Sequence, residues 1–198
     1  DRLLNFIKFR RTIRQFKDKK VEKEKLKKII DAARFTPTAG NRQDTSFTVL
    51  IDDLNRYRNL TYQSLSRKAE KVLSSSNGES KIHRKYALML KRMCRDYKKD
   101  PKSSDNLFFN APAVIAVSAE SPVNAALASG NMELMANALN LGVVFSGFSV
   151  TAAEDNQEIK DFLNLKENKE LVTVMIIGYP DVEYQRTVPR KKADVEWK

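Results

Sequence analysis

The sequence has almost none of the residues that build disulfides, metal clusters and histidine-based active sites. Its 198 residues include one Cys, Cys94, and one His, His83. A single Cys excludes an internal disulfide and a multi-Cys metal site, and it suits a reducing compartment. One His argues against a catalytic triad or a His-rich metal centre. If the chain is an enzyme, we therefore expect a bound cofactor to carry the chemistry, with no catalytic side chain and no metal.

Long apolar runs are also missing. No segment approaches the roughly 20 apolar residues that a membrane helix needs, and no stretch has the pattern of a signal peptide. We therefore expect a cytoplasmic protein without a membrane partner. The length and the 41% content of hydrophobic residues predict a single domain over residues 1–198.

Acidic residues are too few to balance the basic ones. The chain has 36 Lys and Arg against 25 Asp and Glu, a net charge of +11, and the basic residues are concentrated in residues 8–28, 81–102 and 186–192. Such a surplus favours anionic partners, among which nucleic acid must be considered. A nucleic-acid groove would also show interleaved aromatic residues or glycine-rich loops, and the sequence has neither. We therefore expect solvated helix faces and no nucleic acid, and a basic binding protein remains an alternative.

The strongest candidate site is the segment Arg10–Arg14, which contains three Arg, one Thr and one Ile. Arg presents a planar fork that binds two phosphate oxygens at once. A helix predicted over residues 22–35 separates this segment from the loop 37–43, Pro-Thr-Ala-Gly-Asn-Arg-Gln. That loop offers hydroxyl, amide and backbone donors, and Gly40 can adopt a positive φ. We interpret the two segments as holding a phosphorylated cofactor, with the helix fixing their separation.

The alternation of apolar segments predicts an α/β or α+β fold with a central sheet covered on both faces. Short β-branched segments predict strands, and amphipathic segments predict helices between them. Strands are expected at residues 46–51, 113–118, 143–148 and 171–177. Helices are expected at residues 1–9, 22–35, 54–73, 81–98, 122–141 and 151–163, with Gly142 capping the helix at 122–141. Residues 181–198 lack periodicity and are expected to extend across the folded body, where residues 183–195 could add a fifth strand.

Residues 74–102 are expected to leave the body of the domain. Ser74–Gly78 predicts a flexible loop, and the very basic helix that follows belongs to a helical excursion over residues 81–102. This excursion has two possible roles: it is a lid over a pocket, or it simply packs against the body of the domain. We expect Cys94 and His83, which lie on the basic helix, to be packing or surface residues.

Four separated segments together resemble the FMN-dependent nitroreductase family, and within it the compact branch that is often fused to a ferredoxin-like domain. The first two are RRTIR at 10–14, with Phe16 and Val21, and AARFTPTAGNRQ at 32–43. The third is the small-residue helix leading into 141–143 and 145–147, and the fourth is IGYP at 177–180 with 189–191 and Trp197. The resemblance implies a three-layer α/β/α sandwich with a mostly antiparallel sheet, as a homodimer with domain-swapped C-terminal tails.

The resemblance also implies where FMN would bind, in pockets at the subunit interface. Arg10, Arg11, Thr12 and Arg14 match the segment that grips the phosphate and ribityl chain, whereas Pro37, Thr38, Ala39 and Asn41 match a loop from the other subunit. Phe145, Ser146 and Gly147 match the backbone beside the flavin ring, and Arg190 and Lys191 match late basic residues that return to the phosphate. Three departures are Thr12 for the common Ser, Asp44 for a Pro, and Ser146 where some members carry Glu.

The activity implied by the resemblance is transfer of reducing equivalents through bound FMN. NAD(P)H or reduced ferredoxin would be the donor, and a nitroaromatic, quinone or enone would be the acceptor. The site residues would then bind the flavin and set its potential. A flavin enzyme of another chemistry, such as dehalogenation or cleavage of the flavin ring, and a non-catalytic basic binding protein are the alternatives.

Overall fold

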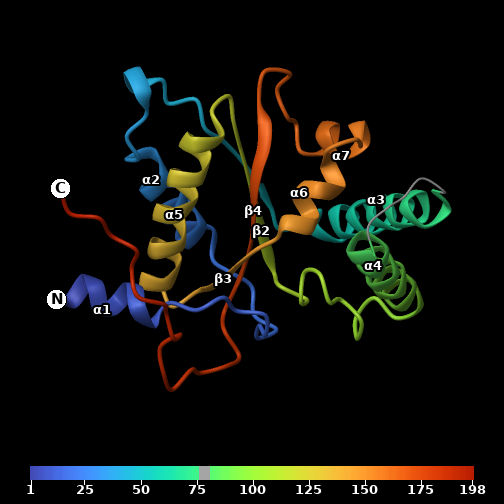
Figure 1. The fold of residues 1–198 in the computed structure, drawn as a ribbon, viewed down its shortest axis with the longest axis horizontal. Helices are drawn as coiled ribbons and strands as arrows, with labels where there is room; N and C mark the ends of the chain where they lie inside the picture. Colours follow the sequence, from blue (N-terminus) through green and yellow to red (C-terminus); the bar gives the residue numbers. More distant parts are fainter. Residues whose placement is uncertain (76–80) are drawn as a thin grey trace.

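A four-stranded sheet forms the centre of the fold in the computed structural model, which describes residues 1–75 and 81–198. The spatial order of the strands is β1-β2-β4-β3, and every neighbouring pair is antiparallel (Figure 1). The strands are β1 (Ser46–Leu50), β2 (Ala113–Ala119), β3 (Gly142–Phe145) and β4 (Glu170–Gly178). All seven residues of β2 are buried, as expected for a central strand with helices over both faces.

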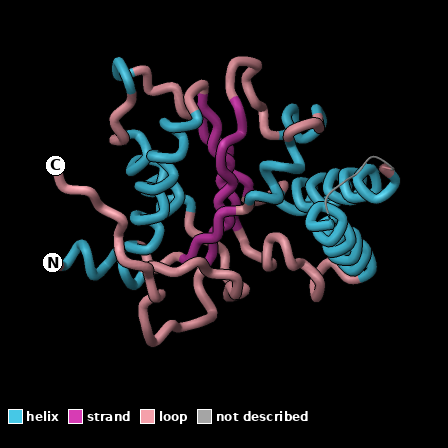
Figure 2. Tube along the Cα trace, viewed as in Figure 1, coloured by secondary structure: helices cyan, strands magenta, loops and turns pink. Residues whose placement is uncertain are grey.

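Helices cover both faces of this sheet and make three layers (Figure 2). One face carries α2 (Lys23–Arg34) and α5 (Pro122–Ala138). The other carries α3 (Leu54–Ser74), α4 (Lys81–Lys99), α6 (Gly147–Ala153) and α7 (Gln157–Phe162). The N-terminal helix α1 (Arg2–Phe9) buries none of its residues. The expected α+β sandwich is therefore confirmed. None of the described helices is both long and apolar enough to cross a bilayer.

Two apolar clusters fill the space between the layers. Ile29, Ile115 and Met132 belong to the cluster between the sheet and the α2/α5 layer. Tyr57 and Phe108 belong to the cluster on the opposite face. Both clusters are built from residues on strands and on helices distant in sequence, so the sheet holds the two helical layers in fixed positions.

The predicted end of the small-residue helix was wrong. α5 ends at Ala138, and Asn140 rather than Gly142 takes the left-handed conformation, with φ of 59°. The amide of Leu141 donates to the carbonyl of Ala136 at 2.8 Å, which closes a Schellman motif. Asn tolerates this conformation better than most non-glycine residues, so the cap needs no Gly.

Gly142 instead allows a close approach between two segments. A Cβ atom on Gly142 would lie 2.6 Å from Cγ1 of Ile13. We expect Gly142→Ala to cost about 1–3 kcal/mol of folding free energy, because the segment that carries the arginines must move. Urea unfolding followed by circular dichroism measures this cost. Gly130→Ala is the control, since a Cβ there meets no atom within 4 Å apart from adjacent residues and the backbone of its own helix. Equal stability of the two variants would contradict the prediction.

The helix predicted over residues 151–163 is two shorter helices, and the strand predicted over 143–148 ends at Phe145. Ser146 and Asn156 cause both differences. Each accepts a hydrogen bond from a backbone amide three residues later, as an N-cap does, and so begins a new helix.

The remaining sequence predictions concern the ends of the elements. α3 extends to Ser74, and residues 76–78 of the predicted flexible loop lie outside the described residues. Residues 181–198 contain no strand or helix, so the fifth strand considered for residues 183–195 is not formed within this chain. Cys94 is buried against α3, as expected for a packing residue, and burial raises the pKa of its thiol to about 11.

Candidate functional site

The arginine segment lies along β3, on the side away from β4. Thr12 forms a parallel bridge with Val143, and the amide of Ile13 donates to the carbonyl of Val143 at 3.0 Å. Ile13 is buried, whereas Thr12 and Arg14 are exposed on either side of it. This alternation is that of an extended strand with one buried face. The hydroxyl and guanidinium groups therefore lie on the outer side of the segment.

Backbone hydrogen bonds fix the far end of the same segment to the end of β4. Phe16 forms an antiparallel bridge with Pro180. The amide of Lys17 donates to the carbonyl of Tyr179 at 2.9 Å, and the amide of Asp181 donates to the carbonyl of Gln15 at 2.9 Å. Residues 12–17 are consequently held at two strands and provide a rigid base for their side chains.

Arg10 forms an ion pair with Glu133 of α5, a residue that sequence reasoning missed. The contact uses one guanidinium nitrogen, Nη1, and leaves the rest of the fork for other acceptors. Burial raises the pKa of the Glu133 carboxyl, and the charge of Arg10 opposes that rise. Glu133 thus holds the guanidinium of Arg10 in place from α5.

Arg11 is occupied by the C-terminal tail. Its guanidinium lies 3.9 Å from the centre of the Tyr184 ring, and Nη1 donates to the carbonyl of Arg186 at 3.0 Å. Stacking over an aromatic face combined with a hydrogen bond is a typical use of Arg at a fixed contact. Within the described residues, the side chains of Thr12 and Arg14 form no such contact. These two, with Arg10, are the groups of the segment open to a ligand.

The segment Phe145–Gly147 begins at the last residue of β3, the strand whose Val143 pairs with Thr12. Phe145 has 40% of its surface exposed. The hydroxyl of Ser146 is buried and lies 2.8 Å from that of Ser149, so it acts as a structural cap. At Gly147 the position of a Cβ has no atom within 4 Å apart from adjacent residues and the backbone of its own helix. The exposed ring and the open backbone form a surface against which a flat molecule can lie.

The loop with Pro37, Thr38, Ala39 and Asn41 is at the other end of α2 (Figure 1). The twelve residues of α2 span about 18 Å at 1.5 Å per residue. Within the loop, Thr38 accepts a hydrogen bond from the amide of Gln43 at 3.1 Å, and Gly40 has a φ of 60° as expected. One chain therefore does not bring this loop to the arginine segment.

Asp44 anchors that loop to the start of α5. Its carboxylate accepts hydrogen bonds from the amide of Ser121 at 2.9 Å and the side-chain amide of Asn124 at 2.7 Å. The bond from Ser121 lowers the pKa of Asp44, burial opposes this, and the bond from Asn124 lowers it further. The Asp that departs from the family pattern thus has a structural role in this chain.

The lowered pKa of Asp44 has a consequence for acid stability. A carboxyl whose pKa is lowered by folding stabilises the folded state at pH values above its ordinary pKa of about 3.9. This contribution is lost as the pH falls from there through the pKa of the folded state. We expect the Asp44→Asn variant to be less stable than wild type at pH 7, with a gap that closes below about pH 4. Urea unfolding midpoints across this pH range give the comparison. A gap independent of pH would contradict the assignment.

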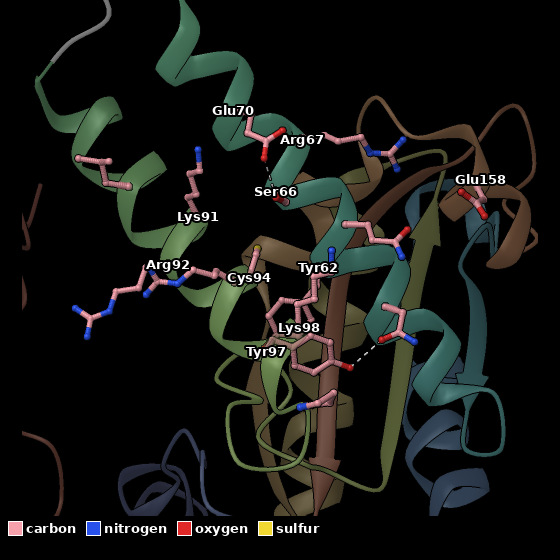
Figure 3. A pocket seen from close by; sticks show the side chains of 15 residues that line it. Tyr62, Ser66, Arg67, Glu70, Lys91, Arg92, Cys94, Tyr97, Lys98 and Glu158 are labelled. Carbon is pink, nitrogen blue, oxygen red and sulfur yellow. Dashed lines mark hydrogen bonds between the residues drawn. The ribbon is translucent and has the colours of Figure 1, made fainter.

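Arg190 and Lys191 are exposed in the tail, and no described contact links either residue to the arginine segment. A large hollow in the described structure also lies elsewhere. It has a volume of about 1110 Å³, is bounded by α3 and α4 and includes none of the residues predicted to bind FMN (Figure 3). The sequence-predicted residues that one chain does assemble are therefore those of segments 10–14 and 145–147.

Known proteins share this arrangement of elements. The model of the nitroreductase family matches residues 7–179. A relative from Archaeoglobus fulgidus, named as a candidate NADH dehydrogenase/NAD(P)H nitroreductase, is 25% identical over 91% of this chain and 86% of its own. The crystal structure of a nitroreductase with bound FMN from Bacteroides fragilis superposes with a TM-score of 0.72, at 18% identity over all of both chains. A candidate NADH oxidase from Clostridium acetobutylicum superposes with a TM-score of 0.58, at 29% identity over 94% of both. The chain therefore belongs to the nitroreductase family.

Proposed function

We propose that this protein is an FMN-dependent oxidoreductase. The observation that carries the proposal is that Thr12 and Ile13 of the arginine segment pair with Val143 of β3, the strand that leads directly into Phe145–Gly147. Cationic donors at one end and an open, flat backbone surface at the other match the two ends of a flavin mononucleotide. The family membership and the FMN in the Bacteroides fragilis structure support the same cofactor.

The donor set fits a phosphate group. Arg10 and Arg14 would grip its oxygens and Thr12 would add a hydroxyl donor, against the charge of about −1.5 to −2 that a phosphate monoester carries near neutral pH. The backbone at Gly147 would leave room for the ring. When bound, FMN supplies the two-electron redox chemistry, and the residues of this chain hold and orient it and keep out competing reactions. Arg190 and Lys191 would reach the phosphate only if the tail moves or comes from a second copy.

We further propose a homodimer in which each FMN lies between two copies, with residues 1–198 folding as one domain in the cytoplasm. The loop at Pro37–Asn41 would then come from the partner, since it is remote from the arginine segment of its own chain. The apolar surface that one chain leaves exposed supports this assembly, because large exposed apolar patches mark interfaces. It includes Leu3, Leu4, Ile7, Phe9, Phe35, Val123, Leu127 and Trp197.

The electron donor would be NAD(P)H or reduced ferredoxin, and the acceptor a nitroaromatic, quinone or enone. The nicotinamide donors in the names of two similar proteins support the first choice. The chain would bring donor and acceptor in turn to the same open face of the flavin, so no side chain has to act as a nucleophile.

The test is reconstitution with FMN, gel filtration and an absorbance spectrum of the protein fraction. We expect equimolar flavin on a dimer, bleached anaerobically by NADH, NADPH or reduced ferredoxin and recoloured by nitrofurazone, menadione or cyclohexenone. A folded protein that retains no flavin would overturn the cofactor. If the protein retains flavin but none of the donors reduces it, the protein binds FMN without the proposed activity. Flavin that is reduced but recoloured only by a halogenated substrate would favour dehalogenation.

A further inference from the structure

A groove between α3 and α4, remote from the flavin residues, is bounded by the strongly basic helix α4. α4 contains eight Lys and Arg against one carboxylate, Asp96, a net charge of +7 out of the +11 of the whole chain. The groove has a volume of about 1110 Å³ (Figure 3). This exceeds the roughly 300–1,000 Å³ of typical small-molecule pockets.

The floor of the groove is apolar and its rim is cationic. Tyr62 and Tyr97 stack with ring centroids 3.7 Å apart, and buried Cys94 lies beside them. Five cations line the groove against Glu70 and Glu158, and they are Arg67, Lys91, Arg92, Arg95 and Lys98. Within the described residues, Arg67, Lys91 and Lys98 have no ion-pair partner.

One exposed apolar residue of α4 adds to the apolar part of the groove. Leu88 lines the groove and is 59% exposed. Ile82, Tyr86 and Met89 are also exposed, but they lie on another face of α4 and do not line the groove. An apolar floor with cations on the rim is complementary to an amphipathic helix whose polar face is acidic, bound in the mode of a helix in a groove. A pair of packed helices offers a third helix such a groove.

We propose that the α3/α4 groove docks an acidic amphipathic helix of a protein partner. Two other anionic occupants fit it less well. A single-stranded nucleic acid needs exposed aromatic faces on which bases stack, but Tyr62 and Tyr97 are buried and stack on one another. A flat anionic membrane cannot reach a concave floor, and the walls that it would meet include Glu70 and Glu158.

The experiment uses the full chain and a fluorescein-labelled peptide of about 20 residues, with Leu at the heptad positions a and d and mostly Glu elsewhere. Fluorescence anisotropy gives the affinity at about 50 mM salt, where surface charges are weakly screened. Twin peptides test the design: one has Lys in place of Glu, and the other has the acidic residues and Leu in scrambled order. A labelled single-stranded DNA and anionic phosphatidylglycerol vesicles test the other occupants.

We expect the acidic peptide to bind more tightly than both twins. Lys91→Glu with Lys98→Glu should weaken binding at least about tenfold, since like charges then face the peptide. Leu88→Ser should weaken binding severalfold and still do so at high salt, because its contribution is apolar. Lys20→Glu with Lys28→Glu is the matched control, with the same change in net charge at exposed positions near and on α2. Its affinity should stay within about threefold of wild type.

Several results would overturn the proposal. If the control pair weakens peptide binding equally, only the net charge of the protein matters. If the scrambled peptide binds as tightly as the acidic peptide, the apolar part of the groove does not contribute to recognition. Absence of binding by the acidic peptide would reject the groove. Tighter binding of the DNA or the vesicles, lost in Lys91→Glu with Lys98→Glu, would assign the surface to nucleic acid or membrane. Circular dichroism of each variant shows whether it is folded.

Discussion

Replacing Arg10 and Arg14 together with Ala is expected to release FMN from the protein while the fold persists. Hydrogen bonds to charged groups contribute about 1.5–3 kcal/mol each, so the pair contributes about 3–6 kcal/mol, a loss in affinity of roughly a hundredfold to ten-thousandfold. Gel filtration after reconstitution, with flavin absorbance measured in the protein fraction, gives the occupancy. Far-UV circular dichroism gives the fold.

The control for that prediction removes the same charge from the same stretch of chain. Lys17 and Lys20 have exposed side chains that make no described hydrogen bond or ion pair. Lys17→Ala with Lys20→Ala should therefore retain flavin close to the wild-type level, apart from a modest electrostatic loss at low salt. If the two double variants lose flavin equally, the phosphate does not sit on the arginine fork, and the general positive field of the segment explains the binding.

Glu133 illustrates what the sequence could not predict about this site. The small-residue character of its helix is visible in the sequence, and so is the arginine segment. The ion pair joins residues 123 positions apart, and the rotation of α5 about its own axis decides whether Glu133 faces Arg10. That rotation results from packing against the sheet. One clue was present, because Glu133 is the only carboxylate in the long helix predicted over residues 122–141.

Local chemistry was predicted more successfully than long-range pairing. β2 and β4 were predicted to within one residue at each end, because short apolar segments rich in β-branched residues favour strands. Gly142 was assigned as a helix cap because Gly usually fills that role. Its real function, close packing against Ile13, depends on which segment lies beside β3. Such neighbours are set by the whole fold rather than by adjacent residues.

Arg11 shows the same limit at the scale of a single side chain. Sequence pattern groups it with Arg10 and Arg14, but its contact with Tyr184 depends on the course of a tail without periodicity. The loop at Pro37–Asn41 shows that the contacts between subunits are equally hard to predict from the sequence. Its separation from the arginine segment by the length of α2 means that the proposed pocket is incomplete in one chain, so a monomer should bind FMN less tightly than a dimer.

Replacing Asp105 with Ala is expected to be the most destabilising change of one side chain outside the apolar core. Its carboxylate is 1% exposed and lies 3.3 Å from Nε of Arg58. It accepts hydrogen bonds from the hydroxyl of Tyr62 and from the amides of Phe108 and Asn110, each at 3.0 Å. Removing one partner of a buried ion pair costs about 3–5 kcal/mol, because the other charge and the buried donors lose their acceptor.

Thermal unfolding gives the size of the Asp105 effect. For a chain of this length, about 3–5 kcal/mol corresponds to a fall of roughly 6–20 °C in Tm. Asp105→Asn is the matched variant: it keeps the shape and one carbonyl acceptor, so its Tm should lie between those of Ala and wild type. Burial, with the nearby charge of Asp105, raises the pKa of Tyr62, so this hydroxyl remains a donor that needs an acceptor. Since Asp105 holds the turn that leads into β2, the central strand, its loss should lower Tm whether or not FMN is bound. A variant whose Tm fell only in the presence of flavin would instead place Asp105 in the cofactor site, because it would have lost only the stabilisation that bound FMN supplies.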